Sequence, residues 1–171
     1  MPDINRVDDL EIGQDLEFQR REWTVERIGW AAMAVIILMA LLGLFGTGPL
    51  NNTSIESQDG LLRVDYDRFA RRKAPTLPLK VYIESSAAQD GEAHLWLDRN
   101  YLEGFDIHRI TPQPDSVIAD QDRLTYVFEL GEQGQLIQVT FLLQPEQLGV
   151  ISGQIGLEGA QGVEVSHFAY P

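Results

Sequence analysis

The 171-residue chain has no cysteine and few basic residues, with 13 Lys and Arg against 26 Asp and Glu and a formal net charge of -13. The lack of cysteine excludes disulfides, thiolate metal sites, covalent haem attachment and a thiol nucleophile. The acidic composition argues against nucleic acid as a partner, because phosphate binding requires a concentrated basic face. The folded part must therefore be stabilised by packing alone.

One long stretch lacks charge altogether. Residues 28–50 contain no Asp, Glu, Lys or Arg, and their apolar block runs from residue 31 to residue 45. About 20 apolar residues in a helix span the roughly 30 Å of hydrocarbon in a bilayer. The absence of ionisable groups removes the usual signature of a proton relay or an ion path. We therefore expect a single transmembrane helix over residues 28–50 that serves as an anchor or a subunit contact.

A cleaved signal peptide is the main alternative for this segment. Such a peptide has a short basic start, an apolar core of about 7–15 residues and a small-residue cleavage site. Here an acidic arm of 27 residues precedes a longer apolar core, and Pro49 directly follows the only small-residue candidate, residues 46–48. Proline is a poor residue at that position because of its fixed ring. The pattern favours an uncleaved anchor.

Positive charge marks the amino side of the expected span. Arg20, Arg21 and Arg27 precede it, whereas the carboxyl side has no Lys or Arg until Arg63. Because the flank that stays in the cytoplasm retains Lys and Arg, residues 1–27 should form a cytoplasmic arm that ends in a juxtamembrane helix. The remainder of the chain should lie across the membrane.

Both ends of the expected helix have surfaces suited to lipid or to a partner. Near the inner boundary, arginines and tryptophans share one face, which indicates a headgroup anchor or a docking face. These residues are Arg20, Trp23, Arg27 and Trp30. Near the outer boundary, small residues allow another helix to approach closely, although only Gly43 and Thr47 have the four-residue spacing of a dimer motif. The small residues are Gly43, Gly46 and Thr47.

Beyond the span, the helical period gives way to a period of two. Leu62, Val64 and Tyr66 alternate with charged residues, and similar runs follow at residues 79–83, 95–97, 105–110, 124–130, 135–143, 150–157 and 163–168. About eight short strands with brief connections predict an all-β domain over residues 61–171, joined to the span by a polar linker at 51–60. An immunoglobulin-like antiparallel sandwich is expected, with a small β-barrel as the alternative.

Two finer expectations concern this domain. The last four strands should form sequential hairpins, and Trp96 should lie in the core, where a large aromatic ring buries most apolar surface.

No catalytic or cofactor-binding site is predicted. His94, His108 and His167 fall on different expected strands and in no metal-ligand motif. A sandwich could still gather His94, Asp98, Asp106 and His108 around a divalent ion, because imidazole and carboxylate groups suit such ions. With no residue pattern typical of catalysis, we expect a protein that is not an enzyme.

A basic segment stands out in the acidic domain. It contains four of the nine Lys and Arg residues that follow residue 50, namely Arg68, Arg71, Arg72 and Lys73. This segment is expected to be a loop after the first strand. It either balances nearby acids in solvent or contacts anionic headgroups or an acidic partner close to the anchor.

Three stretches carry a resemblance to a known group of proteins. The run Arg20-Arg-Glu-Trp-Thr-Val-Glu-Arg-Ile-Gly-Trp30, the span ending Leu-Leu-Gly-Leu-Phe-Gly-Thr-Gly-Pro49 and the ending Phe168-Ala-Tyr-Pro171 resemble small uncharacterised bacterial single-pass inner-membrane proteins with a periplasmic immunoglobulin-like domain. The resemblance implies a bacterial source and an inner-membrane location with residues 61–171 in the periplasm. It implies no activity.

Taken with the residue patterns, this location favours an accessory or interaction subunit of a membrane assembly. Its expected partners are the lipid bilayer and another membrane protein, with no cofactor. A tethered periplasmic module that binds a metal or a small ligand is the alternative function.

Overall fold

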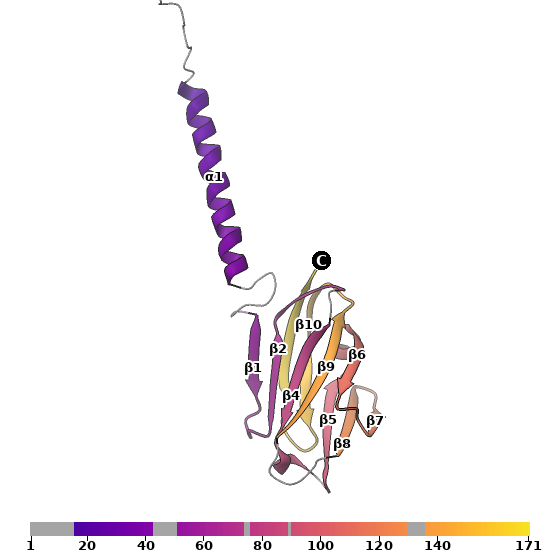
Figure 1. Cartoon of the computed structure of the whole chain (residues 1–171). Helices are drawn as coiled ribbons and strands as arrows, with labels where there is room; N and C mark the ends of the chain where they lie inside the picture. Colours follow the sequence, from indigo (N-terminus) through magenta and orange to yellow (C-terminus); the bar gives the residue numbers. More distant parts are fainter. Residues whose placement is uncertain (1–15, 43–50, 74–75, 89, 130–135) are drawn as a thin grey trace, which may run out of the picture. The chain divides into compact units, whose positions relative to one another are not determined.

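The computed structural model describes residues 16–42, 51–73, 76–88, 90–129 and 136–171, shown as coloured ribbon in Figure 1. The chain divides into two compact units, Met1–Ala40 and Leu41–Pro171. Helix α1 (Leu16–Leu41) lies almost entirely in the first unit. All the strands described below lie in the second unit.

Helix α1 is apolar over most of its length. The most apolar 18-residue window of its segment Arg21–Leu41 has a mean hydropathy of 1.7, and none of that window is buried. The helix is thus long and apolar enough to cross a membrane, a property that a signal sequence near an N-terminus shares. The helix begins at Leu16, before the expected span, and so includes the juxtamembrane part of the arm. The outer end of the expected span, including Gly43, Gly46 and Thr47, falls outside the described residues.

The second unit consists mainly of strands. Its described residues form β1 (Asn52–Glu56), β2 (Leu62–Asp67), β3 (Phe69–Arg71), β4 (Leu77–Ile83), β5 (Glu92–Asp98), β6 (Phe105–Thr111), β7 (Ser116–Ala119), β8 (Arg123–Glu129), β9 (Ile137–Pro145), β10 (Gly149–Leu157) and β11 (Val163–Tyr170). Two short helices interrupt them, a 3₁₀ turn η1 (Ser85–Ala87) and α2 (Arg99–Leu102).

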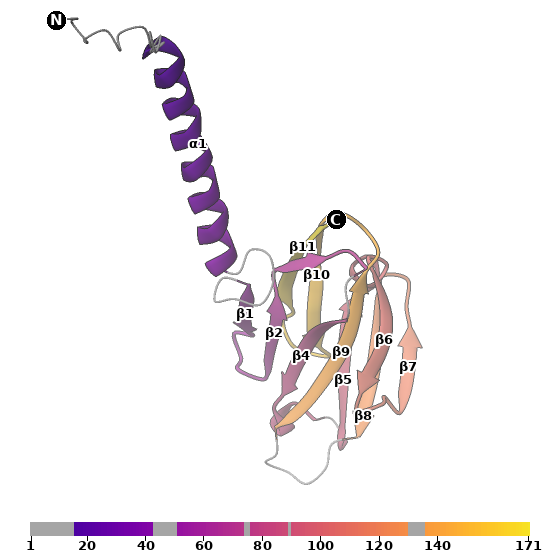
Figure 2. The same ribbon diagram turned by 45° about the horizontal axis from the view of Figure 1, so that its top comes forward.

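The strands form two open sheets and not a closed barrel. One sheet has the order β1-β2-β4-β9-β6 and the other has the order β3-β11-β10-β5-β8-β7. Figure 2 shows the two sheets as layers of the same domain. All pairings are antiparallel except that of β3 with β11. The predicted β-rich, two-sheet architecture is confirmed, and the barrel alternative is wrong.

Alternation along the strands creates the core between the sheets. In β4, Leu79, Val81 and Ile83 are fully buried, while Lys80 between them is exposed. Strand β9 pairs with β4 and contributes Phe141 to the same layer. Because neighbouring side chains on a strand point to opposite faces, each sheet presents one apolar face to the other.

The connections differ from the expected series of hairpins. Strand β8 belongs to the six-stranded sheet, β9 to the five-stranded sheet and β10 to the six-stranded sheet again. Of the last four strands, only β10 and β11 therefore form a hairpin. A short polar connection is compatible both with a hairpin and with a crossing between facing sheets, so the period of two could not distinguish them.

Two segments that were expected to lack regular structure contain strands. Within the expected linker at residues 51–60, β1 pairs antiparallel with β2, with Ile55 opposite Val64. Within the expected basic loop, β3 pairs in parallel with β11 at an edge of the other sheet. Strand β1 is mostly polar, as an edge strand with one side facing water can be, and β3 has only three residues, so neither strand produced a detectable period of two.

Trp96 is buried, but on a different surface from the one expected. Leu95 and Leu97 point into the core, so Trp96 between them lies on the outer face of the six-stranded sheet. Its ring packs against Gly156 and Gly162. A Cβ atom added at Gly156 would lie 2.4 Å from a carbon of the ring, and one added at Gly162 would lie 2.5 Å from another. Its indole N–H donates a hydrogen bond of 3.0 Å to the Leu157 carbonyl. The absence of side chains at these two glycines makes room for the ring.

Candidate functional site

Two of the predicted inner-boundary residues on α1, Trp23 and Arg27, are in contact. The Arg27 guanidinium carbon lies 4.0 Å from the centroid of the Trp23 ring, one helical turn away, in a cation–π contact. Trp30 continues this face and is 64% exposed. Arg21 is also exposed, and the side chain of Arg20 lies outside the described residues. The arrangement gives this side of the helix an exposed aromatic and basic surface.

The suggested metal ligands do not come together. His94 is on β5, where its Nδ1 lies 2.8 Å from a carboxylate oxygen of Glu158. His108 is on β6 in the other sheet, where its Nε2 lies 2.5 Å from Gln144 Oε1 and 3.8 Å from Asp106 Oδ2. Across the described ranges, no group of three His, Cys, Asp or Glu residues could hold a metal ion.

Asp98 has a structural contact instead of a place in that cluster. Its carboxylate accepts a 2.8 Å hydrogen bond from the Gln154 backbone N–H, which ties the end of β5 to β10. An open surface hollow beside β6 includes His108 and Arg109 in its lining. Imidazole and guanidinium groups alone are a poor ligand set for a cation, because the guanidinium is permanently charged.

A buried histidine forms the most unusual polar arrangement in the domain. His167 lies on the inward face of β11 and is 1% exposed. Its Nδ1 is 2.7 Å from the Asp67 carbonyl oxygen, and its Nε2 is 2.8 Å from the Tyr101 hydroxyl. Because a carbonyl only accepts hydrogen bonds, Nδ1 must carry the proton, and Nε2 then accepts from Tyr101. The geometry therefore specifies one neutral tautomer.

The surroundings of this pair keep it uncharged. Rings of Tyr66, Tyr101 and Phe105 lie with centroids 5.0, 5.8 and 5.3 Å from that of His167. Burial lowers the pKa of His167 to about 4, although the hydrogen bond to the Asp67 carbonyl opposes this shift. Burial also raises the pKa of Tyr101 strongly, with a smaller contribution from Tyr66. Such a neutral, enclosed pair fits a structural role.

The sequence carried a signal for the burial of His167 but not for its partner. Val163, Val165 and Ala169 alternate with exposed residues and are buried, so a histidine at position 167 must share their face. Its partner could not be predicted, because Tyr101 belongs to α2, a single helical turn with no detectable period.

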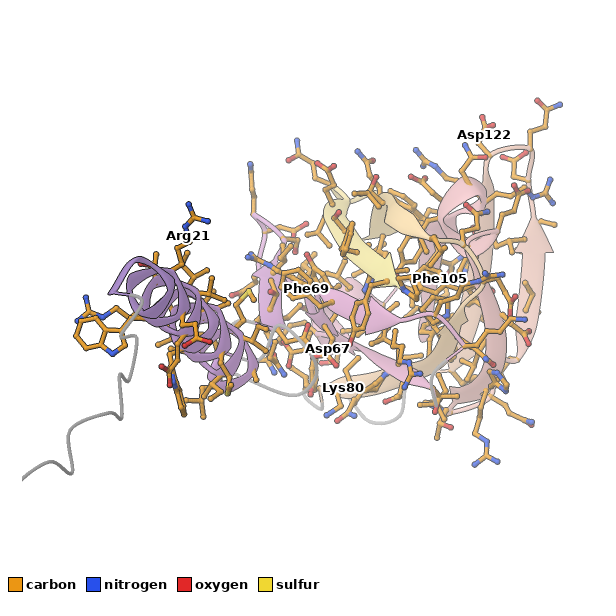
Figure 3. The ribbon with its side chains drawn as sticks, turned by 90° about the horizontal axis from the view of Figure 1, so that it is seen from above. Arg21, Asp67, Phe69, Lys80, Phe105 and Asp122 are labelled. Carbon is orange, nitrogen blue, oxygen red and sulfur yellow. The ribbon has the colours of Figure 1, made fainter. Side chains whose placement is uncertain are left out.

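Figure 3 labels two residues that contact His167, Asp67 and Phe105, in a view of the domain from above.

The four basic residues lie at the same end of the domain as Asp67. Arg72 donates a 2.9 Å hydrogen bond from Nε to the Glu146 carbonyl, and its backbone N–H donates to the Tyr170 carbonyl at 2.7 Å. Arg68, Arg71 and Lys73 are exposed. The basic segment is thus fixed to the sheets through the backbone and side chain of Arg72, while Arg68, Arg71 and Lys73 are directed to solvent.

Comparison with known proteins adds no family to these observations. No protein-family model matches the chain, and a search of curated proteins finds no match.

Proposed function

We propose that this chain is a non-enzymatic, single-pass protein of the bacterial inner membrane, with its amino terminus in the cytoplasm and an immunoglobulin-like sandwich in the periplasm. In this proposal it acts as an accessory subunit that binds another membrane protein. The exposed strand β7 carries the argument for an interaction role, and the unburied apolar surface of α1 supports membrane anchoring.

Strand β7 is the last strand of the six-stranded sheet, and among the described strands it pairs with β8 alone. All four of its residues are exposed, including Val117 at 50% and Ile118 at 54%. These two residues are consecutive and so point to opposite faces of the sheet. Neither face of β7 is therefore covered by the described residues, and its outer edge is free of a sheet neighbour.

An edge of this kind suits a protein partner. Exposed backbone N–H and C=O groups can pair with an added strand, and side chains on both faces add apolar contact. The core does not require Val117 or Ile118, because both lie outside the buried cluster. Burial of a Val or Ile side chain contributes about 1.5–3 kcal/mol, which is enough to affect a complex measurably.

The helix supplies a second contact in this proposal. Trp23 and Arg27 form one exposed surface on it, and Gly43 and Thr47 are expected to give the outer end a small-residue surface. Close packing in a bilayer depends on small residues and van der Waals contact more than on hydrophobicity.

The test is purification of the full-length protein from membranes in mild detergent, followed by identification of stoichiometric partners. Ile118→Asp should reduce partner recovery, whereas the matched control Ser152→Asp places the same charge on an exposed position of β10 and should not. Replacing residues 31–47 by a leucine-rich span keeps insertion but should also reduce recovery. The absence of any stoichiometric partner of the unaltered protein would refute the accessory role.

A further inference from the structure

An exposed apolar band crosses the outer face of the six-stranded sheet where β3, β11 and β10 are adjacent. The register places Phe69 beside Phe168 and Phe168 opposite Val150, so these three form one row. The row points outward because Ala70, Ala169 and Ile151, their neighbours along the strands, are buried. We call this row of Phe69, Phe168 and Val150 the apolar patch.

The patch is unusually exposed for its composition. Val150 is 70% exposed and Phe168 is 46% exposed, while Phe69 is half-buried. Scattered single apolar residues on a surface are ordinary, but a contiguous group that includes two phenylalanines indicates a surface that contacts something.

Basic and aromatic groups border the patch. Arg71 follows Phe69 by two residues on β3, and Tyr170 follows Phe168 by two residues on β11. The register places these two residues side by side, next to the two phenylalanines. Arg68 and Lys73 flank β3 and are exposed. The domain after residue 50 has nine Lys and Arg against eighteen Asp and Glu, yet four of those nine gather within residues 68–73. The local charge is therefore opposite in sign to that of the domain as a whole.

The patch also lies where the chain enters the domain from the helix. The Asn51 carbonyl accepts a 2.8 Å hydrogen bond from Arg68 N–H, and its side-chain oxygen accepts a 2.6 Å bond from Phe69 N–H. Figures 1 and 2 both show the start of β1 and the C-terminus at this end of the domain. Nine residues lie between Leu41 and Asn51, so the ten steps from one Cα to the other reach at most about 36 Å. An anchored helix therefore keeps the patch within reach of the bilayer.

We propose that the apolar patch rests on the surface of the bilayer that α1 crosses, with Arg71 and its neighbours on anionic lipid headgroups. Aromatic rings favour the headgroup boundary, and Lys and Arg near the surface are attracted to anionic lipid. The inference rests on the proposed membrane anchoring and is independent of any protein partner. A bilayer accounts for both the apolar and the basic parts of this surface, whereas a solvated loop accounts only for the charges.

The cysteine-free chain allows a direct test in the full-length protein. Val150→Cys places one thiol in the patch, and Val117→Cys provides a matched control, an exposed valine on β7 at the opposite edge of the same sheet. Each variant is labelled with a polarity-sensitive fluorophore and reconstituted into nanodiscs of phosphatidylcholine, with or without phosphatidylglycerol. Nitroxide-bearing lipid then reports contact by quenching.

The label at position 150 should shift to the blue and be quenched in the anionic discs, while the label at position 117 should do neither. Combining Val150→Cys with Arg71→Glu and Lys73→Glu should at least halve the quenching, whereas Arg109→Glu, an exposed arginine on β6, should leave it unchanged.

Equal solvent exposure of both labels in discs that contain the chain would overturn the lipid contact but leave the anchor intact. A blue shift in lipid-free detergent that grows with protein concentration would instead assign the patch to a second copy and also overturn it. A blue shift that appears only when a co-purified protein is added would assign the apolar patch to that partner and would also overturn the lipid contact. Failure of the chain to enter the discs would refute the anchor itself, and with it this inference.

Discussion

Acid should destabilise the sandwich through a single buried histidine. His167 donates from Nδ1 to the Asp67 carbonyl and accepts at Nε2 from Tyr101. Protonation of Nε2 would remove that acceptor and place a charge among the rings of Tyr66 and Phe105. The folded state therefore resists protonation, whereas the unfolded chain has no such constraint.

The magnitude follows from the difference between the two pKa values. Burial lowers the pKa of His167 from an ordinary value of 6.5 to about 4 in the folded state. Between these values the unfolded chain binds more protons, so the free energy of unfolding falls as the pH falls. The contribution is complete above pH 6.5 and is lost progressively towards pH 4. At about 1.4 kcal/mol per pKa unit, the loss is about 3 kcal/mol.

The assay is urea unfolding of residues 51–171, followed by circular dichroism at several pH values between 7 and 4. The test variant is His167→Gln, because its amide can donate to the Asp67 carbonyl and accept from Tyr101 without titrating. Wild type should lose about 3 kcal/mol more than this variant over the range. His108→Gln, on the surface of β6, should retain the wild-type loss. The Asp67 carboxyl, whose pKa burial raises, is present in every protein compared.

Parallel pH curves for wild type and His167→Gln would refute the reasoning. They would mean that His167 gains its proton without cost in the folded state, which the single tautomer and the enclosing rings do not permit.

Three further substitutions test the packing of the domain. Trp96→Ala should cost about 3–5 kcal/mol of stability by urea unfolding, because it removes a buried ring and leaves a cavity. Gly156→Ala should cost about 1–3 kcal/mol, because its Cβ would lie 2.4 Å from that ring, whereas Ser152→Ala on the exposed face of the same strand should change little. Tyr101→Phe should cost about 1–3 kcal/mol, because it leaves His167 Nε2 buried without a donor, and thermal melting would detect this. Losses below about 0.5 kcal/mol for any of the three would contradict the packing described.

The sequence predicted the features that depend on long or repeated patterns. The uncharged stretch after residue 28 indicated the apolar helix, and the period of two indicated a β domain with an apolar core. Strand β4 shows why this works, since Leu79, Val81 and Ile83 are all buried by alternation alone. Such patterns arise directly from burial, so they survive in the sequence.

Features set by tertiary contact were not predictable in the same way. Strand β1 has one apolar residue, Ile55, and exists because β2 pairs with it. Trp96 has a large apolar side chain, yet it packs on the outer face of the six-stranded sheet and not in the core, because Gly156 and Gly162 leave space for its ring there. In each case the deciding partner is distant in sequence.

The candidate sites show the same difference between local patterns and tertiary contacts. Trp23 and Arg27 are one turn apart on one helix, so their contact followed from local spacing. Whether His94 and His108 lie close together depends on the order of strands in both sheets, which the sequence did not show. The structure places the two histidines on different sheets. The apolar patch likewise depends on β3 lying beside β11, a parallel pairing between segments about 100 residues apart, which no local pattern encodes.

Membrane topology tests the central claim most directly. A reporter enzyme that is active only outside the cytoplasm is fused either after Pro171 or before Met1, and membranes are extracted at alkaline pH to distinguish inserted from attached protein. The account predicts activity only for the fusion after Pro171, in a product of full length that stays in the membrane fraction, because Arg20, Arg21 and Arg27 hold the arm inside. Activity only for the fusion before Met1, or a shortened product released from the membrane, would contradict it.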